Sequence, residues 1–220
     1  MYFSVNTGIT LEQGKRPYME DRAEVKLLEP FPSVLPNYKA AFIGVYDGHG
    51  GSTSVEYIVN NLRAKVVEVW NRLLLDYLRV DPEFDESKPI DNNSPKRIGV
   101  EKLTLIILPT AIAKAFKKID KELFNLWKTK STEDDGSTVV IGIIVYNKLI
   151  VAHCGDSRAT LCRGGVAVEL TKDHKPHFAN EKARIEQTGG QVIRCGSVHR
   201  VNGILAIGRS LGDFLLKVFI

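Results

Sequence analysis

The sequence predicts an α+β domain in which two long helices accompany antiparallel sheets, and three observations support this fold class. Residues 52–78 and 108–127 each place apolar side chains at helical spacing. Strand-like segments occur in runs before and after these helices, without the strand–helix–strand alternation that parallel sheets require. After residue 136, short β-rich stretches are joined by Asn-Lys and Gly-Gly pairs, which are typical of tight hairpins.

The first third of the chain is expected to form strands followed by a helix. Strand-like stretches cover residues 4–13, 23–28 and 39–46, and the last of these is an apolar run that stops at a polar, glycine-rich turn. Ser52 or Thr53 can cap the start of the helix that follows.

Residues 79–99 are polar and contain three prolines, a composition typical of disorder. We therefore expect a flexible insertion between the two helices. It would lie within a single domain that extends over residues 1–220, rather than mark a domain boundary.

The remainder of the chain is expected to begin with a helix and then become mainly β. The helix is predicted over residues 108–127, with Pro109 tolerated in its first turn. Further strands are predicted at residues 137–146, 149–154, 158–163 and 203–207, and a short helix at residues 181–187.

Composition and charge exclude several classes of protein. The chain has 220 residues, of which 44% are hydrophobic and 25% charged, as in soluble globular domains. Its net charge of +4 is too small to predict nucleic-acid binding, and its longest apolar stretches, such as residues 139–146, are too short for a membrane helix. The N-terminus shows no signal peptide, and the odd number of cysteines suggests reduced thiols. We therefore expect a cytoplasmic location, with the nucleus as an alternative.

Acidic residues stand beside glycine turns at three strand ends. Glu20 and Asp21 form one pair, Asp47 precedes Gly48, and Asp156 follows a glycine. Carboxylates and an exposed backbone carbonyl are hard oxygen ligands, which suit Mg²⁺ or Mn²⁺ and suit zinc poorly. Taken singly, each feature is also what an ordinary turn or a solvated surface pair shows.

Two further residues add phosphate chemistry to these ligands. His49 stands two residues after Asp47 and could donate a proton to a leaving group held at the same site. Arg16, four residues before Glu20, offers a forked donor for phosphate oxygens. Carboxylates, a guanidinium and a histidine near one cation favour metal-assisted phosphate hydrolysis. The signatures of a P-loop and of a zinc site are incomplete.

Six motifs, in order along the chain, resemble those of the PPM-type (type 2C) protein serine/threonine phosphatases. They extend from about Gly8 to Leu216 and comprise RPYMED at 16–21, DGHGG at 47–51, GST at 136–138, GDSRA at 155–159, LTKDHKP at 170–176 and LAIGRSLGD at 205–213. The resemblance implies a four-layer αββα sandwich, in which two antiparallel sheets face each other and the metal ions lie at one end of the sheets.

The resemblance also implies roles for the matching acidic residues. Asp47 would bridge two Mn²⁺ or Mg²⁺ ions, and Glu20 and the Gly48 carbonyl would bind one of these ions. Asp21 would support the cluster through water, and Asp156 matches a ligand of a weaker third metal.

For the reaction itself, Arg16 matches the position that holds the substrate phosphate, and His49 matches the proposed general acid. The resemblance implies that Asp47 is catalytic together with Arg16 and His49. A water between the two metal ions that Asp47 would hold is expected to attack phosphorus in line, without a phosphoenzyme intermediate. The implied partners are phosphoprotein substrates that carry phosphoserine or phosphothreonine, with no nucleic acid and no membrane. Family enzymes are usually monomeric.

The pattern of the family continues beyond this chain. After the motif that ends at Asp213, members carry an Asp-Gly-Leu-Trp-Asp-like motif and later an Asp-Asn, which supply further carboxylates to one metal. Neither occurs before Ile220, so we expect that ion's remaining ligands to be missing and the sandwich to be incomplete at its C-terminus. Position 208 is Gly where the family usually has Ser. Two hypotheses remain: a shortened form of an active phosphatase, or a catalytically impaired form that binds phosphoproteins or other partners.

Overall fold

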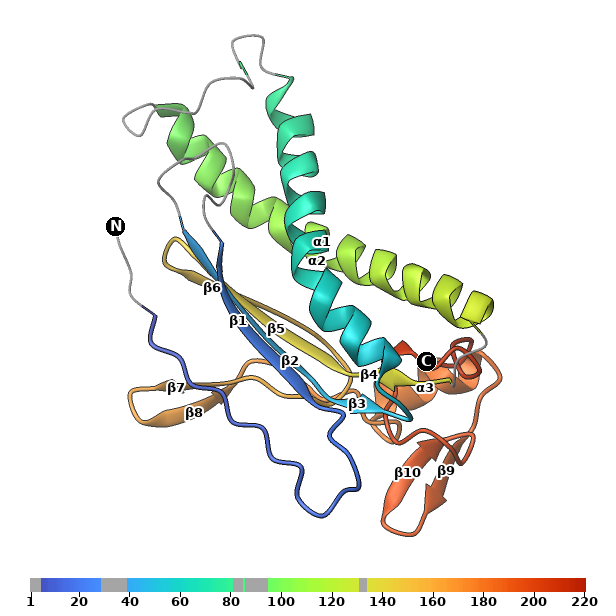
Figure 1. Ribbon diagram of the computed structural model, residues 1–220. Helices are drawn as coiled ribbons and strands as arrows, with labels where there is room; N and C mark the ends of the chain where they lie inside the picture. The colour runs from blue at the N-terminus through green and yellow to red at the C-terminus, as the bar shows by residue number, and fades with distance from the viewer. Residues whose placement is uncertain (1–4, 29–38, 81–84, 86–94, 131–133) are drawn as a thin grey trace.

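The computed structural model describes residues 5–28, 39–80, 85, 95–130 and 134–220, and its elements are shown in Figure 1. The strands pair into one larger sheet and three small ones, all of them antiparallel. In chain order the elements are β1 (Arg22–Leu28), β2 (Ala40–Tyr46), β3 (Gly48–His49), α1 (Thr53–Leu78), α2 (Pro95–Lys130), β4 (Gly136–Ser137), β5 (Val139–Val145), β6 (Lys148–Cys154), β7 (Thr160–Arg163), β8 (Val166–Glu169), α3 (Ala179–Gln187), β9 (Val192–Cys195), β10 (Val198–Val201) and β11 (Leu211–Gly212). The α+β class with antiparallel sheets is confirmed.

The central sheet has four strands in the order β1-β2-β5-β6. On the face that points toward the helices, the side chains are apolar and buried, with Phe42, Tyr46 and Ile143 all fully inaccessible. Phe42 lies opposite Ile143 in the ladder between β2 and β5, so the register places apolar side chains of the two strands side by side. The strand periodicity in the sequence therefore describes this sheet well.

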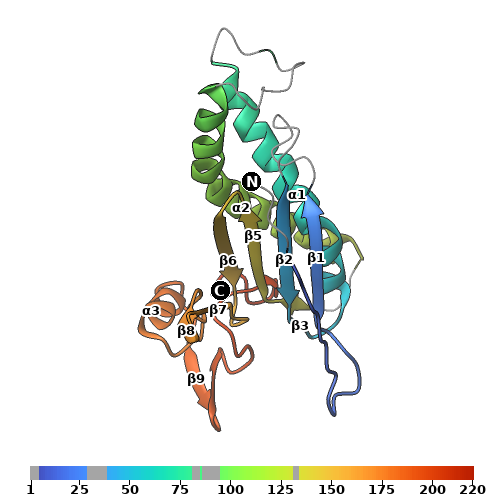
Figure 2. The ribbon, with the colours of Figure 1, turned by 90° about the vertical axis from the view of Figure 1, so that its left-hand side faces the viewer.

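Helices α1 and α2 pack against each other and cover one face of the sheet (Figures 1 and 2). Together with the sheet, the two helices form a single apolar core. The helical side chains in this core include Val55, Ile58, Leu62, Val66, Val69, Trp70, Leu74, Leu108, Ala111, Ile112, Ala115, Ile119 and Leu123. No helix of the described residues is long and apolar enough to cross a membrane.

The second helix is longer than the sequence predicted, because it begins at Pro95 rather than residue 108. Its early turns also contribute to the apolar core: Val100 is 2% exposed and Ile107 is 4% exposed. Pro109 therefore lies inside the helix, on its exposed side, and not in the first turn. The last residues of the predicted insertion thus belong to α2. Residues 81–84 and 86–94 lie outside the described residues, and their flexibility stays a prediction.

The N-terminus of α1 is capped from a distant segment. Ser52 occupies the N-cap position, but its side chain makes no capping hydrogen bond. The carboxylate of Asp135 instead accepts hydrogen bonds from the Ser54 amide (3.0 Å) and from the Ser54 hydroxyl (2.6 Å). An acidic side chain at this position also favours the positive end of the helix dipole, and it fixes the segment before β4 against the start of α1.

The opposite face of the central sheet is open in the described part of the chain (Figure 2). Leu27 is 62% exposed, Val45 is 42% exposed and Leu149 is 43% exposed. The remaining strands form only two- and three-stranded sheets. Within the described residues, therefore, the second large sheet of the expected sandwich is not assembled.

Two predicted strands are wrong. Residues 5–13 have no regular secondary structure, and residue 4 lies outside the described part. Residues 203–207 form a turn with one isolated bridge, between Val201 and Leu205. The physical reason is the backbone just before this segment, because Asn202 and Gly203 have φ angles of 50° and 75°, which reverse the chain instead of extending it.

Candidate active site

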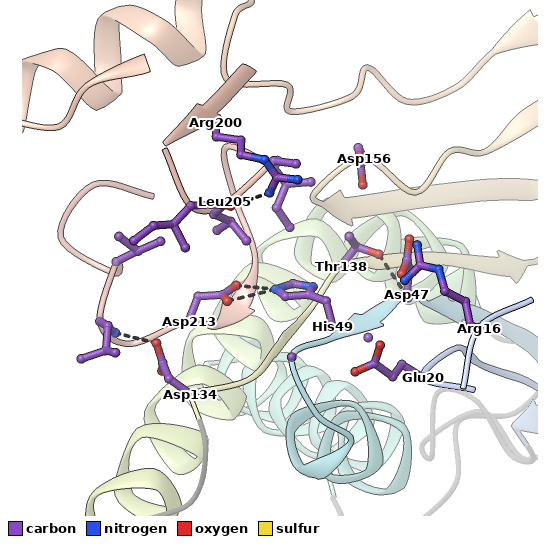
Figure 3. A pocket seen from close by; sticks show the side chains of 17 residues that line it. Arg16, Glu20, Asp47, His49, Asp134, Thr138, Asp156, Arg200, Leu205 and Asp213 are labelled. Carbon is purple, nitrogen blue, oxygen red and sulfur yellow. Dashed lines mark hydrogen bonds and ion pairs between the residues drawn. The ribbon is translucent and has the colours of Figure 1, made fainter. Parts of the chain in front are cut away.

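A pocket of about 720 Å³ lies at the end of the central sheet, beside the small sheet of β3, β4 and β11 (Figure 3). Six of the seven residues predicted from the sequence line it, namely Arg16, Glu20, Asp47, Gly48, His49 and Asp156. The seventh, Asp21, lines an adjoining cavity of about 270 Å³ together with Arg16, Glu20, Asp47 and Gly48. The fold therefore brings together residues that are widely separated in the sequence.

Asp47 follows the last residue of β2, and its backbone is held by Thr138 and by the Ser137 hydroxyl, which donates to the Asp47 carbonyl at 3.2 Å. Its amide donates to the Thr138 hydroxyl (3.2 Å), and its carbonyl accepts from the Thr138 amide (2.9 Å). The side chain faces the pocket. Partial desolvation there, and then the negative charges of Asp21 and Asp156, raise the pKa of Asp47 above its ordinary value. A bound cation would relieve this repulsion.

Close packing of the backbone explains why glycine stands at position 48. A Cβ atom there would lie 2.7 Å from the carbonyl oxygen of Glu20 and 3.0 Å from the side chain of Val55. The absence of a side chain lets the segments that carry Glu20 and Asp47 approach each other. The Glu20 carboxylate is held by the amide of Gly51, which donates to Oε1 at 2.8 Å.

His49 is paired with a buried aspartate that the sequence did not identify as its partner. Its Nε2 lies 3.0 Å and 2.9 Å from the two carboxylate oxygens of Asp213, which is 5% exposed. The Ser210 hydroxyl donates to the same carboxylate. Burial alone would lower the pKa of His49, but the hydrogen bonds and charge of Asp213 outweigh it and raise the pKa. These contacts thus favour the protonated form of His49, which can donate a proton.

The last two predicted residues differ in their surroundings. Asp156 forms an ion pair with Lys175, so its charge is already partly neutralised. Arg16 lies in a turn closed by the Gln13 side chain, which donates to the Arg16 carbonyl at 2.7 Å. In the described part of the chain, no hydrogen bond or ion pair engages the guanidinium of Arg16, which faces the pocket (Figure 3).

Comparison with known families matches residues 8–219 to the family described as "Protein phosphatase 2C". The chain belongs to the protein phosphatase 2C family. It is 34% identical over 213 residues to "Probable protein phosphatase 2C 14" and 34% identical over 222 residues to "Protein phosphatase 2C 77", both from Arabidopsis thaliana. These matches cover 97% and 96% of the chain, but only 39% and 47% of the relatives. The chain thus spans less than half the length of these two phosphatases.

Solved structures agree on the fold of this protein phosphatase 2C chain. A structure described as "serine-threonine phosphatase 2C from Toxoplasma gondii" superposes with a TM-score of 0.66 at 24% identity, over 94% of this chain and 67% of that one. A "C.elegans sex determining protein" gives the same TM-score and identity, over 94% of this chain and 44% of that one. These likenesses show that the chain shares the α+β fold of these structures, with its antiparallel sheets.

Gly208, the departure from the family pattern, is closely surrounded. A Cβ atom at this position would lie 3.1 Å from the His174 carbonyl oxygen and 3.2 Å from the Glu181 carboxylate. A serine would therefore require a small shift of its neighbours. Glycine at position 208 therefore fits the local packing.

Divalent metal ions are general in the protein phosphatase 2C family, and the donors in this pocket fit such an ion in kind. Asp47, Glu20 and the Gly48 backbone offer only oxygen, which suits Mg²⁺ and Mn²⁺. Burial, and then the charges of Asp21 and Asp156, raise the pKa of Asp47, and His49 offsets this effect only in part. Within the described ranges, however, no three His, Cys, Asp or Glu side chains are grouped closely enough to hold a metal ion. The donor atoms are therefore of the kind that Mg²⁺ and Mn²⁺ prefer, but the described residues supply few of them.

Proposed function

We propose that this chain carries the phosphate-binding and metal-binding part of a metal-dependent protein serine/threonine phosphatase. The observation that supports it most directly is the convergence of Arg16, Glu20, Asp47 and His49 on one pocket. The substrates would be phosphoproteins that carry phosphoserine or phosphothreonine. We further propose a cytoplasmic or nuclear location, which follows from the sequence only.

In this proposal each residue has a defined task. The unpaired guanidinium of Arg16 binds two phosphate oxygens in its fork. Asp47, Glu20 and the Gly48 carbonyl would hold a divalent cation, Asp21 would act through water, and Asp156 is a candidate ligand for a further ion. When bound, such an ion supplies a water of lowered pKa and neutralises phosphate charge.

Departure of the serine or threonine oxygen requires a proton. His49 lies in the same pocket, and the buried carboxylate of Asp213 favours its protonated form. Because Asp213 binds Nε2, the proton for transfer would come from Nδ1, or from Nε2 after the hydrogen bond opens. Asp213 is therefore a positioning residue for the proposed acid.

A second candidate function is phosphoprotein binding without turnover. It is favoured by the small number of metal ligands among the described residues, because two metals about 3.5–4 Å apart require several carboxylates to offset their repulsion. For a protein that consists of residues 1–220 alone, we expect phosphopeptide binding with little hydrolysis. For a longer protein that supplies the further ligands, we expect hydrolysis.

The test measures binding and hydrolysis of a phosphothreonine peptide in Mn²⁺, with the unphosphorylated peptide as reference. Arg16→Met should weaken phosphopeptide binding at least ~10-fold, the scale of a lost charged hydrogen bond. Arg72→Met, which removes the same charge from the exposed side of α1, should not. Any hydrolysis should stop in EDTA. Equal binding of the two peptides, or hydrolysis that persists in EDTA, would contradict the proposal.

A further inference from the structure

The pocket has a second wall that the proposed chemistry does not use. Opposite Glu20 and Asp47, it is formed by the segment after β10 and by the segment after β11 (Figure 3). Apart from Asp213, the side chains with which these segments line the pocket are apolar, and comprise Ile204, Leu205, Ala206, Ile207, Leu215 and Leu216. A pocket with one charged wall and one apolar wall fits a ligand that carries a charged group beside an apolar one.

Two large side chains of this wall are exposed to an unusual degree. Ile204 is 64% exposed and Leu215 is 70% exposed. Each lines the same cavity as Arg16 and Asp47, so the apolar surface is continuous with the proposed phosphate site. Exposed aliphatic side chains gathered in a pocket indicate a binding surface more strongly than the same side chains scattered over the molecule.

The exposure of Ile204 does not result from a loosely held loop. The Val201 amide donates to the Leu205 carbonyl at 2.8 Å, and the Ile204 amide donates to the Val201 carbonyl at 2.9 Å. Arg200, which also lines the pocket, donates from Nη1 to the Ile204 carbonyl at 2.5 Å. Asn202 exchanges hydrogen bonds with Gln191, through its amide at 2.7 Å and its side chain at 2.8 Å. The turn is therefore held in place before any ligand arrives.

We propose that Ile204 and Leu215 form a subsite for a bulky aliphatic side chain next to the phosphorylated residue of the substrate. Arg200 acts as a positioning residue, because its bond to the Ile204 carbonyl fixes the turn that presents this wall. The protein would thus prefer phosphopeptides with leucine, isoleucine or valine beside phosphothreonine over those with a small polar neighbour. The inference rests on the proposed phosphate site, since it assumes that the phosphate lies at Arg16.

The test uses fluorescein-labelled peptides in which a non-hydrolysable phosphonate replaces the phosphate of phosphothreonine, so that binding is measured without turnover. One peptide carries leucine on both sides of the phosphonate residue and its match carries serine, and a third has leucine neighbours and unmodified threonine. Anisotropy should show at least ~10-fold tighter binding of the leucine phosphonate peptide than of the serine one, the scale expected for burying one aliphatic side chain.

Substitutions distinguish the subsite from general apolar attraction. Ile204→Ser and Leu215→Ser should each reduce the preference for leucine to less than about threefold, with little change in binding of the serine peptide. Val198→Ser provides the control, because Val198 is 40% exposed on β10, just before the turn of Ile204, and is not among the residues that line the pocket. This variant should keep the preference of the unsubstituted protein.

The outcomes separate the two proposals. Equal binding of the leucine and serine phosphonate peptides would overturn the subsite but not the phosphate site. The same conclusion would follow if Val198→Ser lost the preference for leucine as fully as Ile204→Ser and Leu215→Ser. Equal binding of the phosphonate and unmodified threonine peptides would overturn the phosphate site instead. Failure of all three peptides to bind would contradict both.

Discussion

Replacing Glu181 tests how the segment that carries Asp213 is held in place. Glu181 lies in the first turn of α3, and its side chain is 1% exposed. Arg209 donates to its two carboxylate oxygens at 2.9 and 2.7 Å, and Arg184 donates to it at 3.1 Å. Arg184 also donates to the carbonyls of Gly208 and Phe219. One buried carboxylate therefore ties α3 to the segment before β11, which leads to the pocket.

The expected cost of Glu181→Gln follows from the burial of the three groups. Breaking a fully buried ion pair costs about 3–5 kcal/mol, whereas an exposed pair contributes about 0–1 kcal/mol. Here the carboxylate is buried, but the side chains of Arg184 and Arg209 are 30% and 43% exposed, so water can partly replace the lost charge. We therefore expect the free energy of unfolding at pH 7 to fall by about 2–3 kcal/mol.

The pH dependence of this loss has a definite sign. Burial raises the pKa of Glu181, but the hydrogen bonds and charges of Arg209 and Arg184 outweigh it and lower the pKa below 4.5. A carboxylate with a lowered pKa stabilises the fold above its unfolded pKa, and this contribution is lost as the pH falls through the folded value. The difference between Glu181→Gln and the unsubstituted protein should therefore shrink below about pH 4.5.

Urea unfolding at pH 7 and at pH 3.5 measures both effects. The matched control is Glu186→Gln, in the last turns of the same helix, where a half-exposed carboxylate lies 3.7 Å from Lys182. Its effect should stay below about 0.5 kcal/mol. The reasoning is refuted if the two variants are equally stable at pH 7, or if the loss in Glu181→Gln grows on acidification.

Four other predictions follow from the fold and the pocket. Asp47→Asn should weaken Mn²⁺ binding, measured by calorimetry, and should lower the activity of a longer active form at least ~10²-fold; unchanged binding would argue against its role as a ligand. Thermal stability should fall between pH 6.5 and 4, because burial, with the charges of Arg209 and His153, lowers the pKa of His174 to about 4. The decrease in melting temperature over this pH range should be smaller in His174→Gln. An identical decrease would exclude His174 as the cause. A Gly-Ser linker in place of residues 81–94 should change the unfolding free energy by less than about 1 kcal/mol, and a loss several times larger would show that the segment packs on the domain. Residues 1–220 should self-associate through the open sheet face, so Val45→Lys should raise the monomer fraction in sedimentation velocity, and a wild-type chain that is already monomeric would refute this.

The sequence predicts the central sheet and helices because their patterns are long. Strands β2 and β5 each contain seven residues, and α1 contains 26, so burial repeats several times along each element. The beginning of α2 was missed because its polar first turn resembles the preceding Pro-rich stretch. The capping of α1 could not be predicted either, since Asp135 reaches Ser54 from 81 positions away.

The pocket residues were predicted from chemistry and motif order, whereas their mutual contacts depend on two-residue strands. Strand β4 pairs with β3 and with β11, so that His49 and Gly212 both lie opposite Gly136. No periodicity can be read from strands this short. The pairing of His49 with Asp213 therefore could not be predicted from the sequence pattern, although both residues belong to motifs that the sequence analysis identified.

Gly136 shows why three separate motifs must fold together for this pairing to form. A Cβ atom at Gly136 would lie 2.3 Å from Oδ2 of Asp213 and 2.8 Å from Nε2 of His49, which is too close for any side chain. Glycine in the middle strand thus leaves the space in which the imidazole and the carboxylate meet. Asp213 in turn adopts a φ of 53° and is anchored by its amide, which donates to the Asp135 carbonyl at 3.0 Å. Because Asp135 also caps α1, the same residue anchors the segment that carries Asp213 and the start of the helix that follows His49.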